Sequence, residues 1–480
     1  MLTLSLSIPP LPLKIGGGTH SPLAGGVAGR SPAVGGCKAG SPLAQRGKVL
    51  FTSGMTDIPL KSELLRELHG RGLIYQTTDL AGLDAALTSG VVTGYIGFDA
   101  TADSLQLGNF LQLIRLRWLQ RFGHRPIVLL GGGTTKIGDP SDKDEARPLL
   151  DTASIQANIG NIAAQTAQLL RFDDSADGAV MVDNADWLDG IGYLDFLRDI
   201  GRHVSVNRML TLEGIKRRLD REQNLSFLEF NYPLLQGYDF VELYRRYGCR
   251  LQMGGSDQWG NIVMGVDLAR RLVGQEVFGQ TCALLTTASG AKFGKSAGNA
   301  IWLDATKTPV FDFWQYWRNV EDSDVARFLK IFTELPLAEL QRWDSVQGAE
   351  LNEGKKLLAT EVTALVHGRD AALQAAAAAQ AAYAAGHGGS AAGGIDNLPT
   401  LQIQPQDLAT GVSIIDLIMQ TGTANTRSDA RRLMEQGGVR LGDAVIKDVN
   451  ATLPANLFAA QSVEAVLSLG KKRRFRLITG

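Results

Sequence analysis

The stretch TGYIGF at 93–98, followed by DATADSLQLGN at 99–109, decides the fold class of this 480-residue chain. Its first six residues form a short, largely apolar run, which is typical of a buried strand. Small and polar residues follow, and the pattern predicts a helix from about Leu105, with Asp103 or Ser104 as its N-cap. Taken alone, this strand–turn–helix unit is common in α/β proteins and indicates only local structure.

Four further apolar runs alternate with helical stretches along the chain. They lie at 126–130, 179–182, 250–253 and 283–286. Strands that alternate with helices predict a mostly parallel sheet of the Rossmann-like class. We assign residues 55–305 to this α/β domain.

The segments on either side differ in composition. Residues 1–54 contain no Asp or Glu and are rich in Gly, Pro, Ser and Ala, so we predict a disordered extension. Residues 306–385 carry apolar side chains at helical spacing and predict a helical domain. A Gly-rich linker is predicted over 386–410, and a small α+β module over 411–480.

Two interpretations of the N-terminal extension remain open. A Ser-containing segment without acidic residues is typical of an organellar transit peptide, whereas the second interpretation is that translation begins at Met55. The small number of arginines favours the second, with a cytoplasmic location expected and an organellar matrix as the alternative. No apolar run reaches the roughly 18 residues of a membrane helix.

The overall composition excludes several classes of protein. A net charge of −1 with 44% hydrophobic residues indicates an ordinary globular chain rather than a generally basic nucleic-acid binder. The three cysteines lie far apart, and the six histidines show no H-x-x-x-H spacing. We therefore expect neither a disulfide framework nor a metal centre built by the protein.

Three polar clusters are candidates for ligand binding. In the first, Gly97 and Gly108 would let a nucleotide approach the backbone, and amides at the helix start would face phosphate. The second, GGSDQWGN at 254–261, follows a predicted strand, where α/β sheets bind ligands. The third, KFGKS at 292–296, has two lysines that would clamp a transferring phosphate. Taken singly, each also fits a capped turn, a tight turn or a solvated basic loop.

The order of these clusters is similar to that in class I aminoacyl-tRNA synthetases, and their spacing resembles the tyrosyl branch of that family. The first cluster resembles the family's His-Ile-Gly-His element, and 292–296 resembles its Lys-Met-Ser-Lys-Ser loop. Further similarities are GDPS at 138–141, NADW at 184–187, HVSVN at 203–207 and YPLLQGYDF at 232–240. The resemblance implies a Rossmann-like catalytic domain, a helical anticodon-binding domain and an S4-like RNA-binding domain.

The implied activity is ATP-dependent attachment of L-tyrosine to tRNA(Tyr) in two steps through tyrosyl-adenylate. The residues that the resemblance assigns to tyrosine are Tyr95, Asp139, Tyr232, Gln236, Asp239 and Gln258. Tyr95 and Asp239 would contact the phenol, and Asp139, Tyr232 and Gln236 would hold the ammonium group. Because buried polar partners of the hydroxyl would stay unpaired with phenylalanine, such a site would reject it.

The resemblance also assigns residues to ATP and to catalysis. The implied ATP contacts are Gly97, Asp99, Thr101, Gly108, Gly255, Asp257, Lys295 and Ser296. The implied catalytic residues are Gln106, Asn109, Lys143, Arg147, Lys292 and Lys295, of which the four cations would stabilise the leaving pyrophosphate. Mg²⁺ would accompany ATP on its phosphate oxygens. Gln106 departs from the histidine usual in the family, and an amide donates a hydrogen bond but cannot carry charge.

The C-terminal module supplies the expected RNA contacts. By resemblance to the S4 domain these are Arg427, Arg431, Arg432, Arg440 and Lys447, although charge alone equally fits a solvated face. The family further implies a homodimer in which one tRNA spans both subunits. Two other interpretations stay open: a tryptophanyl-tRNA synthetase, and a non-catalytic RNA-binding paralogue, which only Gln106 supports.

Overall fold

The computed structural model describes residues 50–51, 59–139, 150–290, 293–296, 299–385, 399–404, 411–424, 426–442, 444–454, 464–470 and 473–479. The predictions for residues 1–49 and for most of the linker therefore lie outside the described residues. Among the described helices, none is both long and apolar enough to cross a membrane.

A seven-stranded sheet in the order β1-β2-β7-β6-β3-β4-β5 forms the centre of the α/β region. The strands are β1 (Leu50–Phe51), β2 (Gln76–Thr77), β3 (Thr93–Phe98), β4 (Arg125–Leu130), β5 (Val180–Asp183), β6 (Cys249–Gly255) and β7 (Phe278–Cys282). The five from β7 to β5 are parallel, and β1 and β2 extend one edge in antiparallel fashion. A mostly parallel α/β sheet was predicted and is confirmed.

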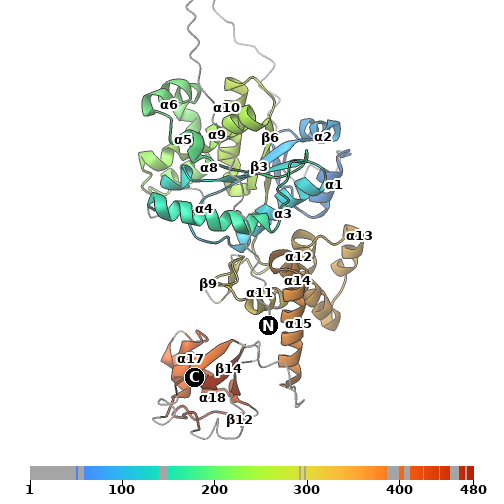
Figure 1. Ribbon diagram of the computed structural model, residues 1–480, viewed down its shortest axis with the longest axis vertical. Helices are drawn as coiled ribbons and strands as arrows, with labels where there is room; N and C mark the ends of the chain where they lie inside the picture. The colour runs from blue at the N-terminus through green and yellow to red at the C-terminus, as the bar shows by residue number, and fades with distance from the viewer. Residues whose placement is uncertain are drawn as a thin grey trace, which may run out of the picture. The chain divides into compact units, whose positions relative to one another are not determined.

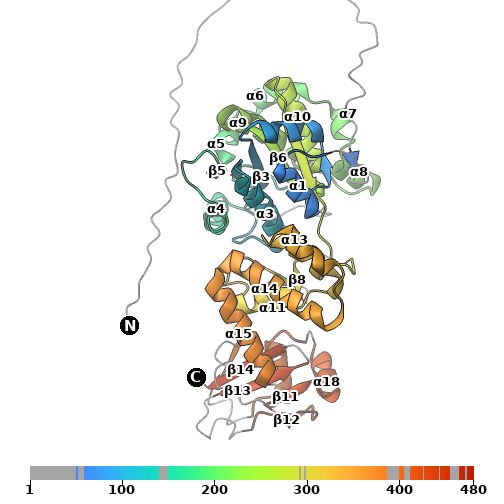
Figure 2. The ribbon, with the colours of Figure 1, turned by 90° about the vertical axis from the view of Figure 1, so that its right-hand side faces the viewer.

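Helices cover both faces of this sheet. Those of the α/β region are α1 (Glu63–Gly70), α2 (Leu80–Ser89), α3 (Leu107–Arg121), α4 (Thr152–Ala167), α5 (Ala185–Leu188), α6 (Tyr193–Asp199), α7 (Val206–Met209), α8 (Glu213–Asp220), α9 (Phe227–Tyr247) and α10 (Trp259–Leu272). Figures 1 and 2 show α9 and α10 on one side of β3 and β6, with α3 on the other.

The pleat of the strands divides the apolar residues between two cores. Ile96 and Val128 pack in the core that includes α3, whereas their neighbours Tyr95 and Ile127 pack in the core that includes α9 and α10. Successive side chains of a strand point to opposite faces, so a strand covered on both faces is apolar throughout. This explains why β3 and β4 were recognisable as unbroken apolar runs.

The strand predicted over 283–286 is wrong. The structure places β7 at Phe278–Cys282, and the chain then leaves the sheet, with Leu284 exposed. Strand β7 is buried along its whole length although it contains Gln280 and Thr281. Both side chains have hydrogen-bond partners: Gln280 accepts from the guanidinium of Arg115 on α3, and Thr281 donates to Gln76 on β2. Polar residues therefore conceal a fully buried strand.

Residues 306–385 were predicted to be helical, and helices are found there. They include α11 (Val310–Arg318), α12 (Val325–Phe332), α13 (Leu337–Leu340), α14 (Leu351–His367) and α15 (Arg369–Ala385). In Figure 2, α11 and α14 lie side by side. Arg71 joins this region to the α/β region, because its buried guanidinium donates to the carbonyl oxygens of Lys330, Thr333 and Leu335 and lies 4.1 Å from the Trp118 ring centroid.

In its described residues, the C-terminal module forms a five-stranded sheet, two helices and its own apolar core. Its elements are β10 (Thr400–Ile403), α17 (Ile414–Gln420), α18 (Arg427–Glu435), β11 (Val439–Leu441), β12 (Ala444–Val445), β13 (Glu464–Leu469) and β14 (Arg473–Thr479). Strand β10 lies inside the range predicted as linker, yet it pairs in parallel with β14. The sheet of this module thus draws on residues before 411.

Candidate active site

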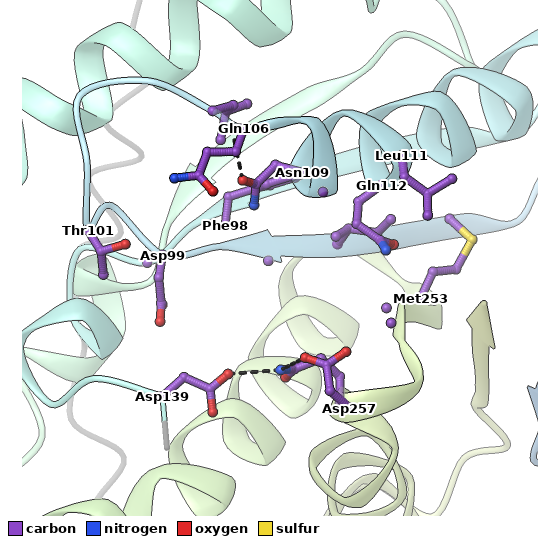
Figure 3. Close-up of a pocket in the computed structure, with 18 of the residues that line it drawn as sticks. Phe98, Asp99, Thr101, Gln106, Asn109, Leu111, Gln112, Asp139, Met253 and Asp257 are labelled. Atoms are coloured by element: carbon purple, nitrogen blue, oxygen red, sulfur yellow. Dashed lines mark hydrogen bonds between the residues drawn. The ribbon is translucent and has the colours of Figure 1, made fainter. Parts of the chain in front are cut away.

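A cavity of about 690 Å³ opens at the carboxyl ends of β3 and β6. The chain runs from β3 outward through β4 to β5, and then returns to place β6 on the other side of β3. At such a reversal the connections leave β3 and β6 in opposite directions, so a crevice forms between them. Figure 3 shows Gln106 and Asn109 on one side of the space, with Asp139 and Asp257 across from them.

The start of α3 supplies one wall of the cavity. Helix α3 begins at Leu107, and its N-cap is Gln106 rather than the predicted Asp103 or Ser104. The Asn109 side-chain oxygen accepts from the backbone N–H of Gln106 at 3.2 Å. Gly108 has open space where a Cβ would stand, so the backbone of the first helical turn is accessible to a ligand.

The floor of the cavity holds two buried polar groups, Tyr95 on β3 and Asp239 on α9, each 1% exposed. The Asp239 carboxylate accepts from Asn184 Nδ2 at 3.0 Å and from Trp187 Nε1 at 2.8 Å. Among the described residues, the Tyr95 hydroxyl has no hydrogen-bond partner. A buried hydroxyl without a partner is costly, so Tyr95 is suited to pair with a polar group of a ligand.

Burial changes the protonation of both groups. Loss of hydration raises the pKa of Asp239 to about 8, against the opposing effect of the Asn184 and Trp187 hydrogen bonds. Burial, and after it the charge of Asp239, raises the pKa of Tyr95 well above its ordinary value. The Tyr95 hydroxyl therefore stays neutral and can donate a hydrogen bond, and the neighbouring Asp239 carboxyl can accept one. Together they suit a ligand hydroxyl, which both accepts and donates.

A hydrogen-bond network runs from Asp239 toward the cavity mouth. Asn184 Nδ2 also donates to Thr134 Oγ1 at 3.0 Å, and Thr134 Oγ1 donates to Asp99 Oδ1 at 3.0 Å. The Tyr232 hydroxyl lies 3.2 Å from Asp99 Oδ2. The network sets the orientation of Asp99 and Tyr232, and both line the cavity.

A second network organises the turn after β6. Gln258 Nε2 donates to Asp139 Oδ2 at 2.8 Å and to Asp257 Oδ2 at 3.0 Å. Asn261 Nδ2 donates to Gln236 Oε1 at 2.9 Å and to Gln258 Oε1 at 3.2 Å. Carboxylate and amide oxygens from three separate segments are thereby gathered on one wall, which suits a cationic ammonium group.

The structure brings most of the predicted site residues into this one cavity. Those that line it are Tyr95, Gly97, Asp99, Thr101, Gln106, Gly108, Asn109, Asp139, Tyr232, Gln236, Asp239, Gly255, Asp257 and Gln258. Lys143, Arg147 and Lys292 lie outside the described residues. Lys295 and Ser296 are described as main chain only, in the short strand β8 (Lys295–Ser296), which pairs with β9 (Asn299–Ala300).

Several residues of the cavity were not assigned a role from the sequence. Asn184 and Trp187 were noted only as a motif, and the structure shows that they hold Asp239. Thr134 and Gln252 also line the cavity, and Gln252 lies opposite Tyr95 in the β3–β6 register. Gln252 is a single polar residue inside strand β6, and such a residue carries no periodic signal, so only its neighbours in space reveal it.

No group of three or more His, Cys, Asp or Glu side chains in the described parts of the chain is arranged to hold a metal ion. The carboxylates of the cavity are spread over separate walls and engaged by amide or hydroxyl donors. These side chains offer a ligand hydrogen bonds and charge.

The RNA residues predicted in the C-terminal module lie on its surface. Arg427, Arg431, Arg432, Arg440 and Lys447 are all exposed. Arg427 forms an ion pair with Asp416, and Arg432 forms one with Asp429 at 2.6 Å. Exposed pairs of this kind are weak, so both arginines remain able to meet phosphate.

Comparison with known proteins agrees with this geometry. The model of the family "tRNA synthetases class I (W and Y)" matches residues 88–384, more than half of the chain. The fold and the cavity, together with this match, define a class I aminoacyl-tRNA synthetase of the tryptophan and tyrosine group.

The relatives narrow the assignment further. A tyrosine–tRNA ligase from Rhodospirillum rubrum is 53% identical over 414 residues, which cover 86% of this chain and 97% of the relative. One from Cereibacter sphaeroides is 51% identical over 413 residues, covering 86% and 97%. The chain belongs to the tyrosine–tRNA ligase family.

A solved structure supports the same relationship. The C-terminally truncated mitochondrial tyrosyl-tRNA synthetase of Aspergillus nidulans is 30% identical, with a TM-score of 0.60, and the match covers 66% of this chain and 93% of that one. That of Coccidioides posadasii is 31% identical, with a TM-score of 0.57, covering 65% and 91%.

Proposed function

We propose that the cavity is the site where this tyrosine–tRNA ligase binds tyrosine and ATP and forms tyrosyl-adenylate. The family assigns the reaction: the chain joins tyrosine to tRNA(Tyr) with ATP as substrate. The observation that supports the location is the buried pair at the cavity floor. The Tyr95 hydroxyl has no hydrogen-bond partner in the part of the chain that the structure describes, and Asp239 is held by two donors. A phenol reaching this floor would accept from Tyr95 and donate to Asp239.

The ammonium end of the tyrosine substrate would face polar side chains that stand one to two helical turns from Asp239 on α9. Tyr232, Gln236 and Asp239 stand at positions i, i+4 and i+7 of one helix, so they share a face directed at the cavity. Asp239 would meet the phenol, and Tyr232 and Gln236, with Asp139 across the cavity, would surround the ammonium group. The carboxylate would then point toward the start of α3, where ATP is expected.

Positioning and charge stabilisation would carry the activation step. The tyrosine carboxylate oxygen attacks the α-phosphorus of ATP, the bond to the β-phosphate bridging oxygen breaks, and pyrophosphate leaves. The N–H of Gly108 in the first turn of α3, with the side chains of Gln106 and Asn109, would contact the phosphates. ATP would bring Mg²⁺ on its own oxygens. We assign stabilisation of the pyrophosphate to Lys143, Arg147, Lys292 and Lys295.

The first test is ATP–pyrophosphate exchange on the purified full chain with tyrosine, phenylalanine or tryptophan as the amino acid. Exchange with tyrosine alone would support the cavity floor as the hydroxyl-reading site. Lys295→Ala should lower the exchange kcat strongly and leave the KM for tyrosine little changed, since a phosphate clamp does not touch the amino acid. Normal exchange by Lys295→Ala would remove that residue from the clamp.

For the homodimer we propose the face formed by α6, α7 and the start of α9. Its large apolar side chains are unusually exposed: Tyr193 60%, Leu194 76%, Val206 59% and Phe227 66%. Exposed large apolar side chains gathered on one part of a protein are typical of a protein interface. Light scattering should give a dimer for the wild type and a monomer for Leu194→Asp combined with Phe227→Asp; a dimer of unchanged stability in the double variant would place the interface elsewhere.

For the C-terminal module we propose an S4-like role in binding tRNA(Tyr). The support is the group of exposed basic residues on α18 and the strands that follow it. Arg431→Ala combined with Arg440→Ala should raise the KM for tRNA in aminoacylation and leave pyrophosphate exchange unchanged. An unchanged KM for tRNA would assign these residues to a solvated face.

A further inference from the structure

The described part of the loop, 293–296, is attached to the helical region through the ring of Phe293. This ring is 8% exposed and lies within 6.0 Å, between centroids, of four aromatic rings. Tyr316 and Trp317 come from α11, and Phe328 and Phe332 come from α12. We name Phe293 and these four residues the aromatic anchor.

The same anchor reaches the helix that forms a wall of the cavity. Phe332 stacks on Phe293 at 5.3 Å with an interplanar angle of 19°, and on Phe110 of α3 at 5.8 Å with an angle of 8°. Phe110 lies one residue after Asn109, in the first turn of α3. One ring of the helical region therefore packs against both the loop and the helix start.

Main-chain hydrogen bonds hold the loop on two sides. The Gly294 N–H donates to the Tyr316 hydroxyl at 3.0 Å, and the Gly294 carbonyl accepts from the Ile301 N–H at 2.9 Å. The Ile301 carbonyl in turn accepts from the N–H of Leu107 at 3.3 Å, at the start of α3.

Gly294 is the residue that this arrangement requires. It has φ +81°, and a Cβ added there would lie 3.3 Å from the Cβ of Leu107. A side chain at this position would be strained and would also press on the first residue of α3. The loop backbone is thus placed closely between α3 and α11, one residue before Lys295.

We propose that Phe293 and Tyr316 are positioning residues for tyrosine activation, which hold the loop so that Lys295 is presented at the start of α3. This inference rests on the proposed function of the loop. Tyr316 does not line the cavity, and Phe293 lines it with a ring that is only 8% exposed. Phe293 fixes the loop by packing, and Tyr316 fixes it by accepting one backbone hydrogen bond. Because burial raises the pKa of Tyr316 to about 12, its hydroxyl stays protonated throughout an ordinary assay range.

The decisive variant is Tyr316→Phe, which keeps the ring in the anchor and removes only the acceptor for Gly294. We expect the kcat of tyrosine-dependent pyrophosphate exchange to fall about 2- to 10-fold, as the loss of one neutral hydrogen bond allows. The KM for tyrosine should not change, because no residue of the tyrosine end of the cavity is altered. Phe293→Leu, which keeps apolar volume but loses ring stacking, should lower kcat in the same way.

Two controls separate positioning from general damage. Tyr244→Phe removes a hydroxyl on α9 outside the anchor, and Phe313→Leu removes a buried ring of α11 that contacts Trp317 but not Phe293. Both should leave kcat of the folded protein unchanged, whatever their effect on thermal stability. An unchanged kcat in Tyr316→Phe, or a fall matched by the controls, would overturn the inference. Absence of tyrosine-dependent exchange in the wild type would instead refute the proposed function.

Discussion

Replacing Tyr95 by Phe tests the cavity floor with the smallest possible change. The Tyr95 hydroxyl is buried and has no hydrogen-bond partner among the described residues, and its ring packs edge-on against Phe240 with centroids 5.4 Å apart. Removing the oxygen keeps this packing and deletes a polar group that the free protein does not use. Most losses of a buried hydroxyl destabilise a protein because a bond is lost, and here no such bond exists to lose.

The expected magnitudes follow from this geometry. The free energy of unfolding should stay equal or rise by up to about 1 kcal/mol, since a buried unpaired group is removed. The KM for tyrosine should rise about 2- to 13-fold, which corresponds to one neutral hydrogen bond of about 0.5–1.5 kcal/mol. Phenylalanine offers no hydroxyl, so its weak activation should not fall, and the preference for tyrosine over phenylalanine should decrease.

Urea unfolding and pyrophosphate exchange with both amino acids measure these quantities. Tyr244→Phe is the matched control, because it removes a tyrosine hydroxyl on α9 that does not line the cavity. A Tyr95→Phe protein that is about 2 kcal/mol less stable, with an unchanged KM for tyrosine, would refute the reasoning. It would mean that the hydroxyl is paired within the free protein and does not read the substrate.

Three further changes test other parts of the site. Burial raises the pKa of Asp239 to about 8, from an ordinary 3.8, so the folded state holds an extra proton between these values and stability falls as pH rises. Relative to Asp239→Asn, the free energy of unfolding of the wild type, measured with urea, should fall by up to about 1.4 kcal/mol per pH unit between about pH 5 and 8. If the two proteins gave parallel curves of unfolding free energy against pH, the raised pKa of Asp239 would be contradicted. Asn184→Ala removes a donor to Asp239 and an acceptor for the Gly133 N–H. It should lower the free energy of unfolding by about 1–3 kcal/mol and raise the KM for tyrosine. If neither quantity changed, water would have replaced the amide. Gln106→His should leave the exchange kcat equal or higher, because imidazole can donate and also carry charge; a clear fall would show that the amide suits this cavity.

The sequence by itself determined the elements whose signal is local. Strands β3 and β4 were recognised because each is apolar along its length and lies between helices, and the structure places β3 at the predicted residues. Tyr232 and Gln236 stand four residues apart, a spacing that places them on one face of a helix, and α9 contains both. The ordered motifs also identified the family, because their residues must occur at set distances along the chain.

Only the tertiary structure decided which distant residues support one another. The sequence did not indicate that Asn184 and Trp187 hold Asp239, because their contact depends on how β5 and α9 meet across the sheet. The position of strand β7 was predicted wrongly because the strand contains the polar residue Gln280. That side chain can be buried since it pairs with Arg115, which lies far away in the chain.

The same holds for the chain beyond the sheet. Strand β10 was read as linker because a short polar segment becomes a strand only beside β14. From the sequence, the loop that contains Phe293 also fits a solvated basic loop. In the structure, rings of α11 and α12 pack against the Phe293 ring and bury it. Local propensity depends on neighbours within a few residues, whereas burial and hydrogen bonding depend on segments that only folding brings together.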